Sequence, residues 1–179
     1  YANAFNEEEN GHCWEKDDTD SNDWEWERKY EIDSLCYPIW LLHRYYETTK
    51  DEHIFSAQVK IAFRRILDTW STEQHHDEAS SYYFRRTNCP PTDTLSNDGK
   101  GEPTVYTGMT WSGFRPSDDA CQYGYLVPSN MFASVVLGYI AEYANSKYQD
   151  ETMAKEAYML KKQIEQGIEA DAVRNLDGI

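Results

Sequence analysis

The chain has 179 residues, a length that suits one domain, and its 32 acidic side chains outnumber its 17 lysines and arginines to give a formal net charge of −15. Nucleic acid and anionic membrane surfaces both require a basic footprint, so this charge excludes them as partners. Aromatic residues make up 15% of the chain, which argues against a disordered acidic protein, and no apolar run is long enough to span a membrane.

The first 33 residues hold most of the negative charge, with 12 acidic and 3 basic side chains. Asp18, Asp20 and Asn22 alternate as the ligands of a calcium loop do, but such a loop needs glycine where Asp23 stands. We therefore predict a solvated acidic loop and no metal site. The four cysteines form no C-x-x-C pair, which favours free thiols over a zinc site.

Two helices are predicted in the first half of the chain. The first covers residues 34–49, with Asp33 as its N-cap and Pro38 near its first turn, where proline costs least. The second covers residues 53–74, because apolar residues recur there at every third or fourth position. The apolar face of this second helix consists of Phe55, Val59, Ala62, Ile66 and Trp70.

Two more helices are predicted in the last third, over residues 130–147 and 150–174, and Ser129 is the expected N-cap of the first. Within each of the two pairs of helices the connection is short, which favours antiparallel helical hairpins. The apolar faces are Phe132, Val136, Ile140 and Tyr143 in one helix and Met153, Ala157, Leu160, Ile164 and Ile168 in the other.

Between the two hairpins lies a segment without helical periodicity, residues 77–128, rich in glycine, proline, hydroxyl and aromatic side chains. An irregular segment of this length inside a compact domain is uncommon unless it serves a function. Residues 81–84 and 104–107 favour extended backbone, so we expect short β-hairpins. The predicted fold class is all-α: helical hairpins with a long loop and short-hairpin insertion between the pairs.

Residues 107–120 bring together aromatic rings, hydroxyls, Arg115 and the adjacent carboxylates Asp118 and Asp119. Ring faces stack on sugar C–H groups, and carboxylates and guanidinium groups bind sugar hydroxyls. Two close carboxylates also ionise unequally, so one can stay protonated as a general acid, as glycoside hydrolysis requires. The alternative is an ordinary surface turn in which an aspartate caps the next helix or pairs with Arg115.

Three strings in this order resemble glycoside hydrolase family 125: WERKYEIDSLCYP at 26–38, WSGFRPSDDAC at 111–121 and YLVPSNMF at 125–132. Members of that family are exo-acting α-1,6-mannosidases. The resemblance implies an (α/α)6 barrel of helical hairpins, a mannose-containing oligosaccharide substrate, and inverting hydrolysis that needs neither metal nor cofactor.

The resemblance also implies roles for individual residues. The general acid is one of Asp118 and Asp119, and the other aspartate holds sugar hydroxyls or its neighbour's proton. Glu31 and Asp33 are expected to contact sugar hydroxyls. The expected pocket lining is Arg115, Trp111, Ser112, Phe114 and Met109, with Tyr83, Arg85, Ser129 and Asn130 in supporting positions.

The chain is shorter than the resemblance requires, since about four helices are predicted and a full barrel needs about twelve. The family's general base belongs to a stretch that follows the last matched string and is absent here; Glu165 and Glu169 on the last helix are poor substitutes. We therefore expect residues 1–179 to be one incomplete barrel segment, catalytically inactive without the remainder of the barrel. A non-catalytic sugar-binding or structural module is the alternative.

Overall fold

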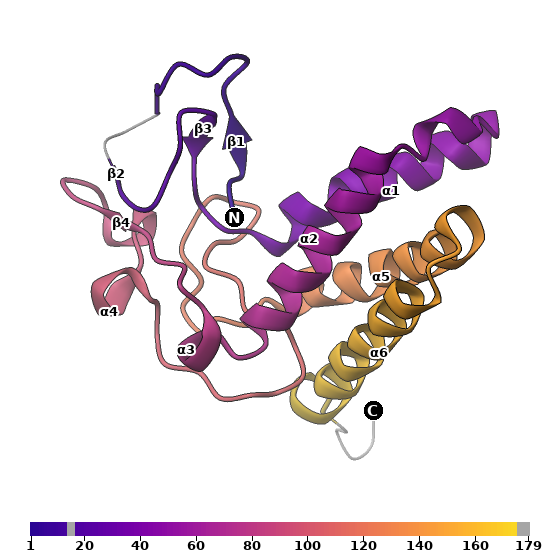
Figure 1. Ribbon diagram of the computed structural model, residues 1–179. Coiled ribbons are helices and arrows are strands. Elements are labelled where there is room, and N and C mark those ends of the chain that lie inside the picture. The colour runs from indigo at the N-terminus through magenta and orange to yellow at the C-terminus, as the bar shows by residue number, and fades with distance from the viewer. Residues whose placement is uncertain (14–16, 175–179) are drawn as a thin grey trace.

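The computed structural model describes residues 1–13 and 17–174 and is mostly helical (Figure 1). Two long helices, α1 (Ile32–Thr49) and α2 (Ala57–Glu73), precede the irregular segment. Two others, α5 (Val127–Tyr148) and α6 (Glu151–Gly167), follow it, and α6 continues into the π-helical turn η3 (Ile168–Ala172). The prediction of a mainly helical chain with four principal helices is thus confirmed.

The remaining elements are short, and most of them lie away from the helices, around the N-terminus and the irregular segment (Figure 1). Strand β1 (Ala4–Phe5) pairs antiparallel with β3 (Glu25–Glu27), and β2 (Asp17–Asp18) pairs antiparallel with β4 (Arg85–Arg86). The second pair ties the N-terminal region to the irregular segment. The other elements are η1 (Glu52–Ile54), α3 (His76–Ala79), η2 (Pro91–Asp93) and α4 (Ser96–Gly99).

Helix α5 is the centre of the helical packing, because it contacts α1, α2 and α6, while α2 also contacts α6. Helix α5 forms the expected hairpin with α6. Because α5 has several neighbours it buries residues on several sides, whereas α6 buries the residues of one face only. Burying apolar area of this kind is the main favourable term of the fold. The helical core includes Ile32, Phe63, Trp70, Leu137, Ile140, Leu160 and Ile164.

Three helix starts differ from the prediction. Helix α1 begins at Ile32, so Asp33 lies buried inside its first turn and does not cap it. Helix α5 begins at Val127, with proline in its first turn, so Ser129 lies within the helix. The third start is α2, which is shorter than predicted because Ser56 caps it, accepting a hydrogen bond from the Val59 N–H at 3.4 Å.

The predicted hairpins at 81–84 and 104–107 are absent, since neither stretch carries a strand. The segment is instead held by single backbone bonds: Trp111 N–H donates to Glu73 C=O at 3.1 Å and Phe114 N–H to Tyr30 C=O at 2.9 Å. Gly124 has φ +73°, and a Cβ there would lie 2.6 Å from the Trp111 ring, so no other residue fits without strain. Burial of aromatic residues thus replaces strand pairing here.

Large apolar side chains are exposed on two neighbouring helices. On α1 the side chains of Tyr37, Trp40 and Leu41 are 42–64% exposed, and on the neighbouring α5 Met131 and Val135 are 55% and 47% exposed. Helices of water-facing proteins normally present polar residues on such a face. None of the described helices combines the length and apolar character needed to cross a membrane.

Candidate functional site

Two buried carboxyl groups stand where α1 begins: Glu31 is 8% and Asp33 6% exposed. Burial raises the pKa of Glu31 to about 7, and the charges of Asp33, Asp118 and Glu27 add to that rise. The Ser34 hydroxyl, which donates to Glu31 Oε2 at 2.7 Å, opposes it. A carboxyl with this pKa is partly protonated at neutral pH and can give or take a proton there.

Asp33 is the second buried carboxyl. Burial raises its pKa, while hydrogen bonds from its own backbone and from Ser129 act in the opposite direction. Its Oδ1 atom has no hydrogen-bond partner among the described residues. A buried acceptor without a partner is uncommon in folded proteins, so this oxygen calls for an explanation such as a bound water or a functional role.

The second acidic group lies in a tight turn between Phe114 and Ala120, which form an antiparallel bridge. Inside it, Arg115 N–H donates to Asp119 C=O and Asp118 N–H to Arg115 C=O, both at 2.8 Å. Asp118 has φ +69°, in the left-handed region, where aspartate is one of the few non-glycine residues found with any frequency.

The side chains of the two aspartates are engaged by different cations. Asp119 Oδ2 lies 2.8 Å from the Arg115 guanidinium and 3.1 Å from the Ser117 hydroxyl, in a half-exposed ion pair. Asp118 Oδ2 lies 2.7 Å from Nζ of the buried Lys29. The pairing with Arg115 that an ordinary surface turn predicts is thus present, but only Asp119 makes it.

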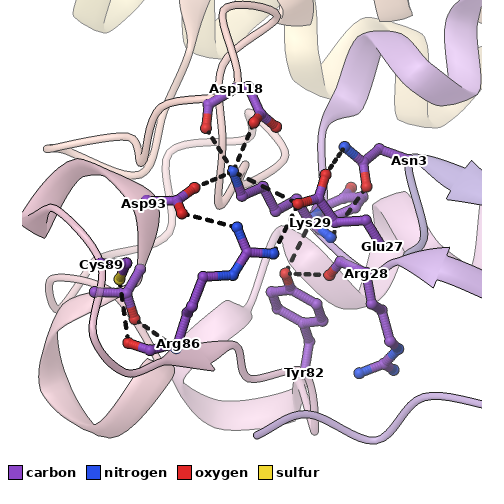
Figure 2. Close-up of polar contacts among 11 residues, drawn as sticks. Asn3, Glu27, Arg28, Lys29, Tyr82, Arg86, Cys89, Asp93 and Asp118 are labelled. Atoms are coloured by element: carbon purple, nitrogen blue, oxygen red, sulfur yellow. Dashed lines mark hydrogen bonds and ion pairs between the residues drawn. The ribbon is translucent and has the colours of Figure 1, made fainter. Parts of the chain in front are cut away.

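Lys29 is the centre of a network of two cations and three carboxylates (Figure 2). Its side chain is fully buried, and its ammonium contacts Asp93, Asp118 and, at 3.8 Å, Glu27. Arg86 contacts Asp93 and Glu27 from the other side, at 2.8 Å each. Burial alone would lower the pKa of Lys29, but hydrogen bonds to Asp118 and Asp93 outweigh it, so its pKa lies above the usual value.

Three predicted pocket residues are buried in the core. Trp111 is 1% exposed and its indole stacks on the His76 imidazole with ring centroids 3.6 Å apart. Phe114 is fully buried against Phe84, and Met109 is 3% exposed. Rings buried in this way support the site from below and offer no face to a ligand at the surface.

The hydroxyl and amide side chains predicted for the site also have structural partners. Ser112 Oγ donates to Phe114 C=O at 2.8 Å and accepts from Ile32 N–H at 3.4 Å, which joins the loop to α1. Asn130 accepts from Thr110 N–H at 2.9 Å and donates to Thr110 C=O at 3.0 Å. Both side chains, like Ser129, are buried, so they position the backbone around Asp33.

Tyr83 and Arg85 lie elsewhere, next to the N-terminal region. Arg85 pairs with Asp18 and approaches Asp98 at 3.8 Å, and its guanidinium lies 5.8 Å from the Tyr83 ring centroid. The Tyr83 carbonyl accepts from the Thr19 hydroxyl at 2.9 Å. These contacts fasten the N-terminal region and do not bring either residue to Glu31 or Asp33.

A cleft of about 560 Å³ opens beside the turn. Arg115 reaches it from the turn, and Cys121, a free thiol, reaches it from the following residues. Burial raises the pKa of Cys121 to about 12, so the thiol stays neutral. Other residues that line the cleft include Thr92, Leu95, Glu102, Tyr123 and Tyr125.

Sequence reasoning missed the network around Lys29. Its partners Asp93 and Asp118 lie 64 and 89 positions away, so no local spacing signals the contact. The available signal was a lysine in a string of aromatic residues that also holds Glu27 and Glu31. A lysine buried among carboxylates is uncommon unless it is paired, as it is here.

The arrangement is suited to proton transfer and to binding hydroxyl groups. Glu31 has a pKa near neutrality, Asp33 has a carboxylate oxygen without a partner among the described residues, and Arg115, which lines the cleft, pairs with Asp119. In the described part of the chain, no group of three or more His, Cys, Asp or Glu side chains is placed to hold a metal ion. Acid–base chemistry by carboxyl groups is what these residues can perform.

The chain is similar to proteins of a known family. Residues 1–178 match the model of a family described as metal-independent α-mannosidases, GH125. The meiotically up-regulated gene 157 protein of Schizosaccharomyces pombe is 30% identical over 156 residues, which cover 82% of this chain and 30% of that protein.

A solved structure is also similar, with a TM-score of 0.94 and 46% sequence identity. It is a metal-independent α-mannosidase of Streptococcus pneumoniae in a non-productive substrate complex with α-1,6-mannobiose. The match covers 99% of this chain and 42% of that one. The present chain therefore spans less than half the length of either relative.

Proposed function

The chain belongs to glycoside hydrolase family 125, the metal-independent α-mannosidases, and we propose that it forms part of an inverting exo-α-1,6-mannosidase that releases terminal mannose. The observation that carries the proposal is the 46% identical relative, solved with α-1,6-mannobiose and similar over 99% of this chain. The substrate would be a mannose-containing oligosaccharide with a terminal α-1,6 linkage.

In this proposal one of the neighbouring aspartates, Asp118 or Asp119, protonates the oxygen of the leaving group. Glu31, Asp33 and Arg115 bind sugar hydroxyls, which the free Oδ1 of Asp33 and the cleft beside Arg115 support. The buried residues serve the site indirectly, by fixing the backbone beneath it: Trp111, Phe114, Met109, Ser112, Ser129 and Asn130. Tyr83 and Arg85 have the more distant role of fastening the N-terminal region.

We further propose that additional helices complete an (α/α)6 barrel with α1 and α5 and bring the general base. The exposed Tyr37, Trp40 and Leu41 on α1 and Met131 and Val135 on α5 provide a surface of the right character for such packing. An inverting mechanism places the two carboxyl groups roughly 6.5–9.5 Å apart, with water between base and sugar. Residues 1–179 alone are then expected to be inactive.

The test is hydrolysis of α-1,6-mannobiose by the complete gene product, followed by NMR from the first turnovers. Inversion releases β-mannose, which then mutarotates, whereas release of α-mannose would refute the proposed mechanism. Asp118→Asn and Asp119→Asn are a matched pair, because each changes one carboxylate to an amide of the same size. The general acid is the aspartate whose replacement abolishes mannobiose hydrolysis, and full activity in both variants would exclude the assigned acid.

The same preparation distinguishes catalysis from binding alone. Mannobiose binding measured by calorimetry without any release of mannose would favour the non-catalytic sugar-binding module. A second sample, residues 1–179 alone, should bind weakly and release nothing, and turnover by this sample would show that its own residues suffice. α-1,2- and α-1,3-mannobioses complete the panel, and equal rates on all three would contradict the linkage preference.

A further inference from the structure

Lys29 is a fully buried lysine that has no role in the proposed sugar contacts. Its side chain is 0% exposed, whereas the carboxylates that it joins, Asp93 and Asp118, are 28% and 56% exposed. The ammonium therefore sits below the surface and points toward Asp118 and Asp93 (Figure 2). An ammonium buried this completely is stable only when its donors are satisfied.

The contact with Asp118 is a double one. Lys29 Nζ donates to Asp118 Oδ2 at 2.7 Å and to Asp118 C=O at 3.0 Å. The backbone oxygen and the carboxylate are thus held by one cation, at a residue whose φ of +69° lies in the left-handed region. Because the next residue is Asp119, fixing the peptide plane after Asp118 also fixes the direction from which the Asp119 side chain leaves the backbone.

Lys29 is itself held in place by a second cation, Arg86, and by the side chain of Asn3. Arg86 contacts Asp93 and Glu27, and both of these carboxylates also lie within 4 Å of the Lys29 ammonium. The Lys29 backbone N–H donates to the Asn3 side chain at 3.2 Å. Lys29 also stands two residues before Glu31, so one residue connects the start of α1 with the acidic turn.

We propose that Lys29 is a positioning residue, which clamps the left-handed turn at Asp118 and thereby aims the carboxyl groups of residues 118 and 119 at the scissile bond. The inference rests on the proposed function, because it takes one of those aspartates as the proton donor. Lys29 itself touches no substrate in this scheme, and it acts only through the placement of the turn.

Lys29→Met, in the complete gene product, removes the ammonium and keeps most of the side-chain volume. Two substrates are compared: α-1,6-mannobiose, whose leaving group needs a proton, and 2,4-dinitrophenyl α-mannoside, whose leaving group departs without one. We expect kcat on mannobiose to fall about 100-fold with little change in KM, because a misplaced acid loses its proton-transfer contribution. On the aryl mannoside we expect a loss of less than about fivefold.

The matched control is Lys147→Met, because Lys147 is a largely buried lysine that, like Lys29, is bonded to a carboxylate, here Glu52 at 2.7 Å, but it lies at the far end of α5. It should leave the ratio of the two activities unchanged. Equal losses on both substrates in Lys29→Met would overturn the proposal and show a purely structural role. If that variant does not fold, the double variant Lys29→Met/Asp93→Asn also removes one of the carboxylates that lost its lysine partner. The double variant is expected to show the same larger loss on mannobiose than on the aryl mannoside.

Hydrogen exchange gives a readout that does not require activity. In Lys29→Met the hydrogen-bonded amides of Arg115, Asp118 and Ala120 should exchange at least about tenfold faster while those of α5 and α6 keep their protection. Unchanged exchange in the turn would refute the clamp, whatever the kinetics. A wild-type protein that hydrolyses neither substrate would instead refute the proposed function, and the exchange experiment would still decide whether Lys29 holds the turn.

Discussion

Glu31→Gln tests whether the buried carboxyl group at the start of α1 destabilises the folded protein at neutral pH. Burial raises the pKa of Glu31 from 4.5 to about 7, so the folded chain binds this proton more tightly than the unfolded chain does. The protonated form therefore stabilises the fold below the unfolded pKa, and the benefit is lost as the pH rises through about 7. The full loss is about 3 kcal/mol.

Glutamine cannot ionise, and its carbonyl oxygen can still accept the hydrogen bond from Ser34. Urea unfolding at about pH 4 should therefore give similar free energies for the variant and the wild type, whereas at about pH 8 the variant should be more stable by up to about 3 kcal/mol. Glu151→Gln is the control, because that side chain is 78% exposed on α6 and its replacement should have little effect at either pH.

The reasoning would be refuted if the difference between Glu31→Gln and the wild type were the same at both pH values. It would also be refuted if the variant were less stable than the wild type at the higher pH. A confirmed result would mean that Glu31 is kept at a cost to stability, as expected for a residue retained for function.

Three further predictions concern the residues around the site. Trp111→Ala should lower the free energy of unfolding by about 3–5 kcal/mol, because it empties a buried position; a loss below about 1 kcal/mol in urea denaturation would contradict its place in the core. Cys121, whose pKa burial raises to about 12, should react with iodoacetamide far more slowly than the exposed Cys13; equal labelling by mass spectrometry would argue against that burial. Asn130→Ala leaves both backbone groups of Thr110 without their partner and should cost about 2–3 kcal/mol in thermal unfolding experiments, and an unchanged midpoint would contradict this.

The helices could be predicted because their apolar periodicity is local information. Met153, Ala157, Leu160 and Ile164 recur at helical spacing, and all four are buried on α6. The first residue of each helix was harder to predict. Asp33 is a residue type typical of an N-cap, yet it lies buried inside the first turn of α1. Tertiary contacts decide such boundaries, and a single sequence does not display them.

The candidate site was only partly predictable, for a similar reason. Asp118 and Asp119 stand out by residue type, but nothing in the string indicates that Lys29 engages one and Arg115 the other. Trp111 was expected to line the pocket, whereas it is buried in the core against His76. Residue types in a loop indicate which chemistry is present, while the side of the backbone on which each side chain lies depends on distant partners.

The apolar surface on α1 and α5 has a consequence for handling residues 1–179 on their own. Exposed Trp40 and Leu41 favour association between copies, while the net charge of −15 keeps copies apart. Salt shifts this balance, because the Debye length falls from about 30 Å at 0.01 M to about 3 Å at 1 M. The polypeptide should therefore be dispersed in dilute buffer and assemble as the ionic strength rises, so salt concentration sets its colloidal state.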